Sequence, residues 1–161
     1  MNDAHLHMVV NHFPIIGAIF SIAILVAGFG FKNEIIKRVA YVVLFTSSLF
    51  TFASMFTGEG AEELVEKLPN VGHQIIHEHE EIAEKFALLM YATGLFSLAG
   101  LFASLKNKSW NQIVGICTLV CAVGSAVVAK TVGTSGGEIR HTEIRANQAT
   151  TPAIESEEHD D

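Results

Sequence analysis

Four long apolar segments alternate with polar connections along the chain. They cover residues 13–31, 39–57, 86–105 and 113–129, and none carries Asp, Glu, Lys, Arg or His in its middle. Each approaches the about 20 residues that an α-helix needs to cross the hydrocarbon core of a bilayer. The pattern predicts an all-α integral membrane protein, a four-helix bundle made of two helical hairpins, with helices at about 13–31, 39–57, 71–105 and 111–130.

Local breakers set the limits of these helices. Pro14 suits the first turn of the first helix, and Gly58 suits the end of the second. Residues 58–67 form a short acidic amphipathic piece, which Pro69 breaks. The third helix is therefore expected to begin at about residue 71 and, at about 1.5 Å per residue, to project above the membrane.

The composition agrees with membrane insertion. Half of the 161 residues are hydrophobic, and the mean hydropathy is positive at +0.39. The residues before the first apolar segment include Asp3 but no Lys or Arg, which a signal peptide would carry there. We therefore expect a retained helix rather than a signal peptide. Residues 1–145 are predicted to form the membrane domain, and the acidic polar tail 146–161 is predicted to be disordered.

The charges predict the orientation in the membrane. The two short connections, residues 32–38 and 106–110, are basic and should therefore be cytoplasmic. Both termini and the segment 58–85 then face the periplasm or the extracellular space. Nearly all carboxylates lie on that side, so the net charge of −7 belongs to one face and argues against nucleic acid as a partner.

Helical phase divides the motif His-Glu-His-Glu-Glu at residues 77–81. At 100° per residue, one stripe of the third helix carries the small residues that usually face neighbouring helices, Thr93, Ser97, Gly100 and Ser104. Extended outward, the stripe passes through Phe86, Ile82, His79 and Ile75, whereas the opposite side carries His73, His77, Glu80, Glu81 and Glu84. His79 is therefore expected inside, as a ligand or a hydrogen-bonded core histidine. His73 and His77 form a solvated face or an i, i+4 metal-binding pair.

A bundle of this topology brings the outer ends of all four helices together. The candidate metal ligands there are His12, Glu62, His79, Glu138 and His141, with Glu59 as the alternative to Glu62. A weak internal repeat places Glu59-x-x-Glu62 after the second helix and Glu138-x-x-His141 after the fourth. A carboxylate and an imidazole at i, i+3 are typical of metal sites in four-helix bundles. A charged turn neutralised by arginines is the competing interpretation.

The ligand types limit the cofactor. Mixed imidazole and carboxylate ligands favour Fe, Zn or Mn over soft Cu(I). His12 and His79 would alternatively ligate a b-type haem, whose propionates would need the cations of Lys130, Arg140 or Arg145. Cys117 and Cys121 stand at i, i+4 in the fourth helix, as packing residues or as a Cu(I) thiolate pair.

The opening of the chain is similar to that of a known family. His7-Met8-Val9-Val10-Asn11-His12-Phe13-Pro14-Ile15 resembles the start of the bacterial membrane-protein family numbered 2231 among domains of unknown function. The resemblance implies four membrane helices in the bacterial inner membrane, a Thr-Gly pair ending the second helix, and a histidine at the start of the third. Thr57-Gly58 and His79, or His77, match these features. The family implies no established activity.

Three functions remain open at this stage. The first is a membrane protein with an outward-facing metal or haem site, serving redox chemistry or respiration. The second is a cofactor-free structural subunit of a membrane complex. The third is a small transporter, which the absence of ionisable residues in mid-membrane disfavours. The expected partners are the lipid bilayer and other membrane subunits or a second copy of the chain. Acyl or phosphoryl transfer has no support, since no nucleophile-elbow, P-loop or Cys-His motif is present, and whether the protein is an enzyme stays open.

Overall fold

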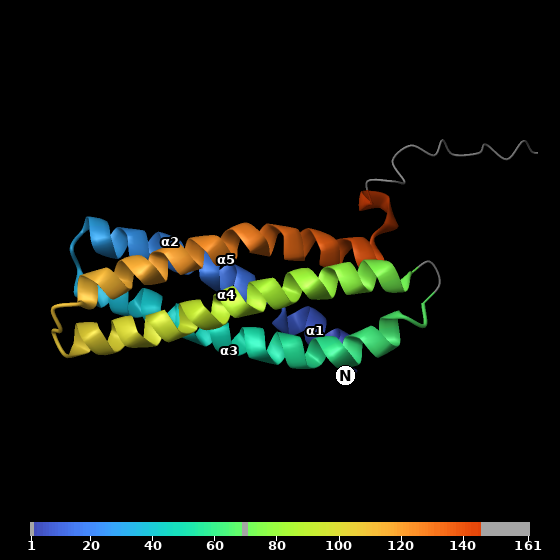
Figure 1. Ribbon diagram of the computed structural model, residues 1–161, viewed down its shortest axis with the longest axis horizontal. Coiled ribbons are helices and arrows are strands. Elements are labelled where there is room, and N and C mark those ends of the chain that lie inside the picture. Colours follow the sequence, from blue (N-terminus) through green and yellow to red (C-terminus); the bar gives the residue numbers. More distant parts are fainter. Residues whose placement is uncertain (1, 69–70, 146–161) are drawn as a thin grey trace, which may run out of the picture.

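Five α-helices and one 3-10 turn make up the described part of the chain, residues 2–68 and 71–145 of the computed structural model. They are α1 (Asp3–Val10), α2 (His12–Gly30), α3 (Glu34–Val65), α4 (His73–Leu105), α5 (Asn111–Arg140) and the turn η1 (Thr142–Ile144) (Figure 1). No strand occurs within these residues. The predicted break at Pro69 and the predicted disordered tail 146–161 lie outside them.

The four long helices form a bundle in which α3 and α5 each contact both α2 and α4 (Figure 1). Within the described residues, four helices are long and apolar enough to cross a membrane. The prediction of an all-α membrane protein with a four-helix bundle is therefore confirmed at this level. The division of the bundle into two hairpins stays a prediction, because each helix contacts both of its neighbours around the ring.

The long helices extend well past the apolar segments. α3 was expected to end near residue 57 but runs to Val65, and α5 runs to Arg140 rather than to about residue 130. α4 has 33 residues, or about 50 Å of helix against about 30 Å of hydrocarbon. The extensions lie at the same end as α1. We call residues 2–12, 58–68, 71–85 and 130–145 the histidine end, and residues 31–38 and 105–111 the basic end.

Small and hydroxyl-bearing residues fill the bundle interior. The stripe predicted for α4 is buried, and so are its counterparts Ser47, Thr51, Thr118 and Ser125. Five of these hydroxyls donate to the carbonyl of the preceding turn, as Thr93 Oγ1 does to Leu89 O at 2.8 Å; the others of this kind are those of Ser47, Thr51, Thr118 and Ser125. Large apolar side chains such as Phe20, Leu95 and Val127 point outward, at 65–70% exposure. Small residues inside and large apolar residues outside are what a bundle surrounded by lipid requires.

Two turns of the same type close the basic end. In each, a residue other than glycine takes the left-handed conformation, Lys32 with φ 51° and Asn107 with φ 50°. The amide after it reaches back to the helix, as Asn33 N donates to Gly28 O at 2.9 Å and Lys108 N to Ala103 O at 2.9 Å. This is the Schellman arrangement, which satisfies the last carbonyls of a helix.

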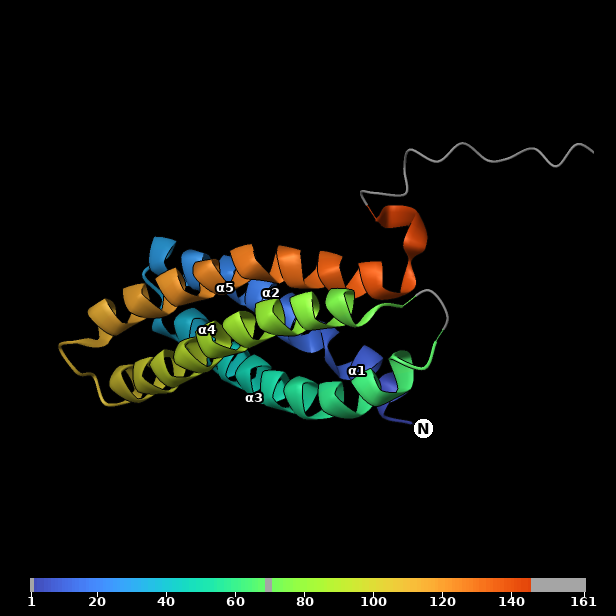
Figure 2. The same ribbon diagram turned by 45° about the vertical axis from the view of Figure 1, so that its right-hand side comes forward.

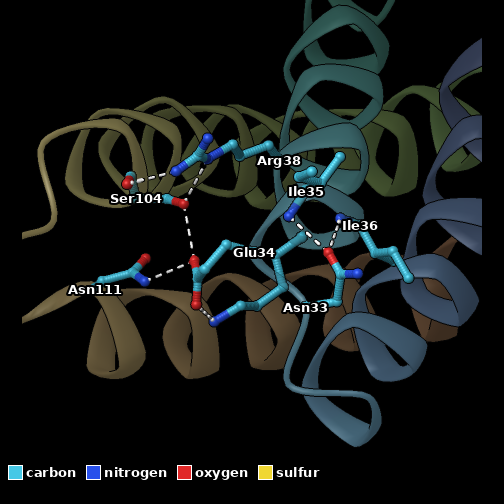
Figure 3. A network of polar contacts seen from close by, with 8 residues as sticks. Asn33, Glu34, Ile35, Ile36, Arg38, Ser104 and Asn111 are labelled. Carbon is cyan, nitrogen blue, oxygen red and sulfur yellow. Dashed lines mark hydrogen bonds and ion pairs between the residues drawn. The ribbon is translucent and has the colours of Figure 1, made fainter.

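A polar network ties the start of α3 to α4 and α5 at the basic end (Figure 3). Glu34 accepts hydrogen bonds from Ser104 Oγ at 2.8 Å and from Asn111 Nδ2 at 2.9 Å, and it forms an ion pair with Lys37. Arg38 donates to the hydroxyl and the carbonyl of Ser104, both at 2.9 Å. The network therefore connects three helices at the point where the apolar segments begin.

Candidate histidine site

Helix α1 lies along the histidine end of α3 and away from the axis of α2 (Figures 1 and 2). Pro14 stands in the first turn of α2 and has no amide hydrogen to donate to the carbonyl of Val10, so a straight continuation from α1 into α2 is disfavoured. No side chain of α1 is fully buried, and an isolated helix of eight residues is unstable in water. Its position must therefore come from contacts with α3.

Two glycines of α3 let α1 approach closely. A Cβ atom at Gly60 would lie 2.8 Å from Cβ of Asp3, which no real pair of such atoms tolerates. A Cβ atom at Gly58 would lie 3.5 Å from Cε1 of His7, which is ordinary contact. The sequence Gly-Glu-Gly at residues 58–60 therefore continues α3 and provides the surface on which α1 rests.

His7 is the residue that this contact positions. Its half-buried ring places Nδ1 3.0 Å from the carbonyl oxygen of Ser54 and 3.3 Å from Oγ1 of Thr57. The Thr57 hydroxyl already donates within its own helix, to Ala53 O at 2.9 Å. Since the Ser54 carbonyl can only accept, Nδ1 of His7 carries the proton, and the lone pair lies on Nε2.

His79 is held in the same way by α5. Its Nδ1 lies 2.8 Å from Oγ of Ser135, whose hydroxyl donates in turn to Val132 O at 3.2 Å. The ring of His79 packs on Gly136, where a Cβ atom would come within 3.0 Å of Cε1. With the Ser135 hydrogen used on its own helix, Nδ1 of His79 donates, and Nε2 again keeps its lone pair.

Electrostatics keep both imidazoles neutral. Both lie outward of the apolar segments, and burial lowers the pKa of each. The charges of neighbouring histidines lower these values further, His12 acting on His7 and His7 on His79. His7 and His79 are thus close enough to repel each other when protonated. Two neutral imidazoles with anchored Nδ1 atoms are the state in which histidine binds a metal.

The two histidines of the 77–81 motif have opposite environments, as the helical phase indicates. His79 is half-buried, whereas the side chain of His77 is 73% exposed. His77 lies 3.5 Å from Oε1 of Glu81 and 3.9 Å from Oε2 of Glu80. His73 is exposed as well and contacts Glu66 at 2.8 Å. These contacts are those of a solvated charged face.

Two carboxyl groups meet between the extensions of α3 and α4. Glu80 is hydrogen-bonded to Glu62, so one of the two holds a proton. Burial, the bond to Glu62 and the charge of Glu62 raise the pKa of Glu80 to about 7, while His77 acts in the opposite direction. Glu62 is a candidate metal ligand from the sequence, and in the structure its carboxyl group is hydrogen-bonded to that of Glu80.

The remaining candidate ligands lie elsewhere at the same end. His12 is exposed and its Nδ1 contacts Met8 O at 2.9 Å. His141 is exposed and its Nδ1 contacts Glu143 at 2.9 Å. Glu138 is half-buried, and its backbone carbonyl accepts from Arg145 at 2.7 Å. Among residues 2–68 and 71–145, no three His, Cys, Asp or Glu side chains are arranged to hold a metal ion. The five predicted ligands are thus not gathered into one group there.

His7 is the site residue that we do not predict from the sequence. The signal was present, because His7 begins the motif whose later members are His12 and Pro14. The sequence favours His12 because it directly precedes the apolar segment. In the structure, the bend before Pro14 leaves His12 exposed and carries His7 onto α3.

The two cysteines are free thiols in α5, both half-buried. They lie within the apolar segment, far in sequence from the histidine site, and the structure gives them no ligand partner among the described residues.

Comparison with protein-family models, with curated proteins and with solved structures finds no match.

Proposed function

We propose that the protein is a membrane protein whose histidine end binds a transition-metal centre, either an ion such as Fe, Zn or Mn or the iron of a b-type haem. A redox or respiratory accessory role would follow. The observation that carries the proposal is the pair His7 and His79, neutral imidazoles from two helices whose Nδ1 atoms are both anchored on oxygen. Such anchoring orients an imidazole and increases its basicity as a ligand.

The ligand set differs from the one that the sequence favours. We propose His7 and His79 as the imidazole ligands, with His12, whose charge acts on His7, as a further candidate imidazole. Two imidazoles suffice as the axial pair of a haem, whereas an ion would need further ligands. Glu62, Glu138 and His141 remain candidates for these.

We propose further that the protein lies in the bacterial inner membrane with the histidine end and both termini outside. Five of the ten Lys and Arg residues lie at the basic end, packed into two short connections, and Glu34 is the only carboxylate there. Short basic connections are retained in the cytoplasm. The bilayer and other membrane subunits, or a second copy of the chain, are the proposed partners.

The proposal is tested on protein purified in mild detergent, by its visible spectrum and by elemental analysis. We expect either a Soret band or a stoichiometric transition metal. His79→Ala and His7→Ala should each abolish it, whereas His77→Ala, two residues away on the exposed face, should retain it. His12→Ala separates the two candidate pairs: loss of the centre in His12→Ala together with its retention in His7→Ala would restore the pair that the sequence favours.

A negative result is also informative. Purified protein that is colourless and metal-free, and that takes up neither added hemin nor added Zn²⁺ or Fe²⁺, would contradict the proposal. A cofactor-free structural subunit would then be the better description.

A further inference from the structure

A cleft of about 300 Å³ opens at the basic end, opposite the histidine site. It lies between the end of α2, the start of α3 and the start of α5, and its walls are formed by Phe29, Lys32, Glu34, Lys37 and Gln112. Its volume is within the range of small-ligand sites. The apolar segment of α2 ends beside it and that of α3 begins there, so in a bilayer the cleft lies at the level of the lipid headgroups.

The wall of the cleft contains a buried lysine, Lys37. Its side chain is only 3% exposed, although a lysine at a membrane boundary usually extends its ammonium group toward water. The ammonium group pairs with Glu34 and lies 5.1 Å from the centre of the Phe29 ring. An ammonium group has three N–H donors, and Glu34 is the one hydrogen-bond acceptor that it meets among the described residues. The remaining donors are buried without an acceptor, which is costly unless a ligand or water supplies one.

The negative charge of Glu34 does not exclude an anionic ligand from the cleft, because the protein itself balances that charge. One of its oxygens pairs with Lys37, and the other accepts from Ser104 and Asn111 (Figure 3). Its charge is therefore neutralised within the protein. Lys32, which is exposed at the turn, then leaves the wall with a net positive charge. The start of α5 has no side-chain cap, so its first amides and the positive end of its dipole point toward this end as well.

We propose that this cleft binds the phosphate group of an anionic phospholipid headgroup. The donors of Lys37, the charge of Lys32 and the uncapped start of α5 all favour a phosphodiester oxygen, and the neighbouring apolar helix faces receive the acyl chains. The lipid is the source favoured over free phosphate, because the cleft lies where headgroups are. The inference depends on membrane insertion and is independent of the histidine site.

Native mass spectrometry in detergent tests the proposal. The protein is titrated with phosphatidylglycerol or with phosphatidylcholine of the same chain length. We expect phosphatidylglycerol to bind at least about tenfold more tightly than phosphatidylcholine. Lys32→Gln should weaken phosphatidylglycerol binding by about tenfold, because it removes one charge-assisted contact of the cleft. The matched control Lys106→Gln removes the same charge from the other turn at this end, outside the cleft, and should change binding by less than about twofold.

A second variant and a second ligand keep the test sharp. Lys37→Arg preserves the charge and the pairing with Glu34 but alters the donors in the cleft, so it should change lipid preference without unfolding the protein. Inorganic phosphate that displaces the lipid would support a phosphate site and would show that soluble anions also reach it. Equal binding of the two lipids, or equal losses in Lys32→Gln and Lys106→Gln, would overturn the proposal. His79→Ala should bind lipid as the unaltered protein does.

Discussion

The partner of an imidazole N–H decides which nitrogen keeps the lone pair. At His7 that partner is a carbonyl of α3, and at His79 it is a hydroxyl of α5. Neither partner has a hydrogen to give to the imidazole, so both rings are held with Nε2 unprotonated. The ring of His77 is exposed, and its described partners are the carboxylates of Glu80 and Glu81. At the scale of single residues, the environment of Nδ1 therefore distinguishes ligand-type histidines from surface histidines.

Removing the acceptor of His79 should weaken metal binding without removing the ligand. We expect Ser135→Ala to lower the affinity for the bound metal or haem by about 10- to 100-fold, as loss of such a supporting bond does. Thr134→Ala is the matched control, because the Thr134 hydroxyl is exposed and bonds only within its own helix, to Lys130 O at 3.0 Å. Nitrogen-15 NMR of labelled histidine gives a second measurement: Ser135→Ala should lose the preference for the Nδ1–H form of His79. An unchanged tautomer and an unchanged affinity would show that Ser135 does not position this ring.

The pair Glu62 and Glu80 should make stability depend on pH. The pKa of Glu80 rises from 4.5 to about 7 on folding, so the folded protein keeps a proton that the unfolded chain releases above pH 4.5. Stability should therefore fall as the pH rises from about 4.5 to about 7 and then level off. Glu80→Gln keeps a hydrogen bond to Glu62 and does not titrate, so its Tm should fall less across this window.

The control for this experiment is Glu81→Gln. Glu81 is exposed on the next position of α4, where it pairs with His77 and Lys85. Circular dichroism melts of this variant should keep the pH dependence of the unaltered protein. If Glu80→Gln and Glu81→Gln show the same slope, Glu80 does not carry a shared proton.

At the scale of helices, α3 shows where a sequence pattern is ambiguous. Gly58 suggests a helix end, because glycine commonly terminates helices, and Gly60 follows two residues later. In the structure neither has a positive φ, and the helix continues through both to Val65. Their role is to let α1 approach, and a contact with a distant segment leaves no periodicity in the sequence. The stripe of α4 was predictable because one helix contains both the small residues and His79. The position of His7 against α3 was not predictable, because it depends on two helices and on the bend before Pro14.

A methyl group at Gly60 should detach α1. The Cβ atom of Gly60→Ala would collide with Asp3, and because Cβ of Asp3 is among the atoms met, the helix itself has to move. Overpacking of this kind costs about 1–3 kcal/mol. We expect hydrogen exchange of the α1 amides to become about tenfold faster or more, while the interior of α2 is unaffected. Bound metal or haem should be lost together with the position of His7.

The control is Gly133→Ala in α5, where an added Cβ atom meets nothing within 4 Å. It should leave exchange in α1 unchanged and stabilise α5 by about 0.5–1 kcal/mol, since alanine favours helix over glycine. If Gly60→Ala also leaves α1 unchanged, close packing on α3 does not hold this helix.

At the scale of the whole molecule, the bundle separates two kinds of chemistry. Small and hydroxyl-bearing residues line its interior, and large apolar side chains cover its sides. The charged groups of residues 2–68 and 71–145 are thus confined to the two ends. Sequence periodicity predicts this distribution, because membrane helices require it whatever their neighbours. It does not predict which side chains meet at an end, since the extensions of α3, α4 and α5 obey no such requirement.

The proposed orientation can be tested by labelling single cysteines from one side of the membrane. In a background with Cys117→Ala and Cys121→Ala, His5→Cys marks the histidine end and Lys108→Cys marks the basic end, both at exposed positions. We expect an impermeant maleimide to label His5→Cys in intact cells and Lys108→Cys only after the membrane is disrupted, because short basic connections stay in the cytoplasm. The reverse pattern would place the histidine site inside the cell, where its redox partners would be cytoplasmic. Labelling of both positions in intact cells would contradict passage of the chain between the two faces.

Adding Lys37→Gln and Arg38→Gln should reduce the fraction of molecules in the expected orientation, because positive charge close to the helix ends determines it.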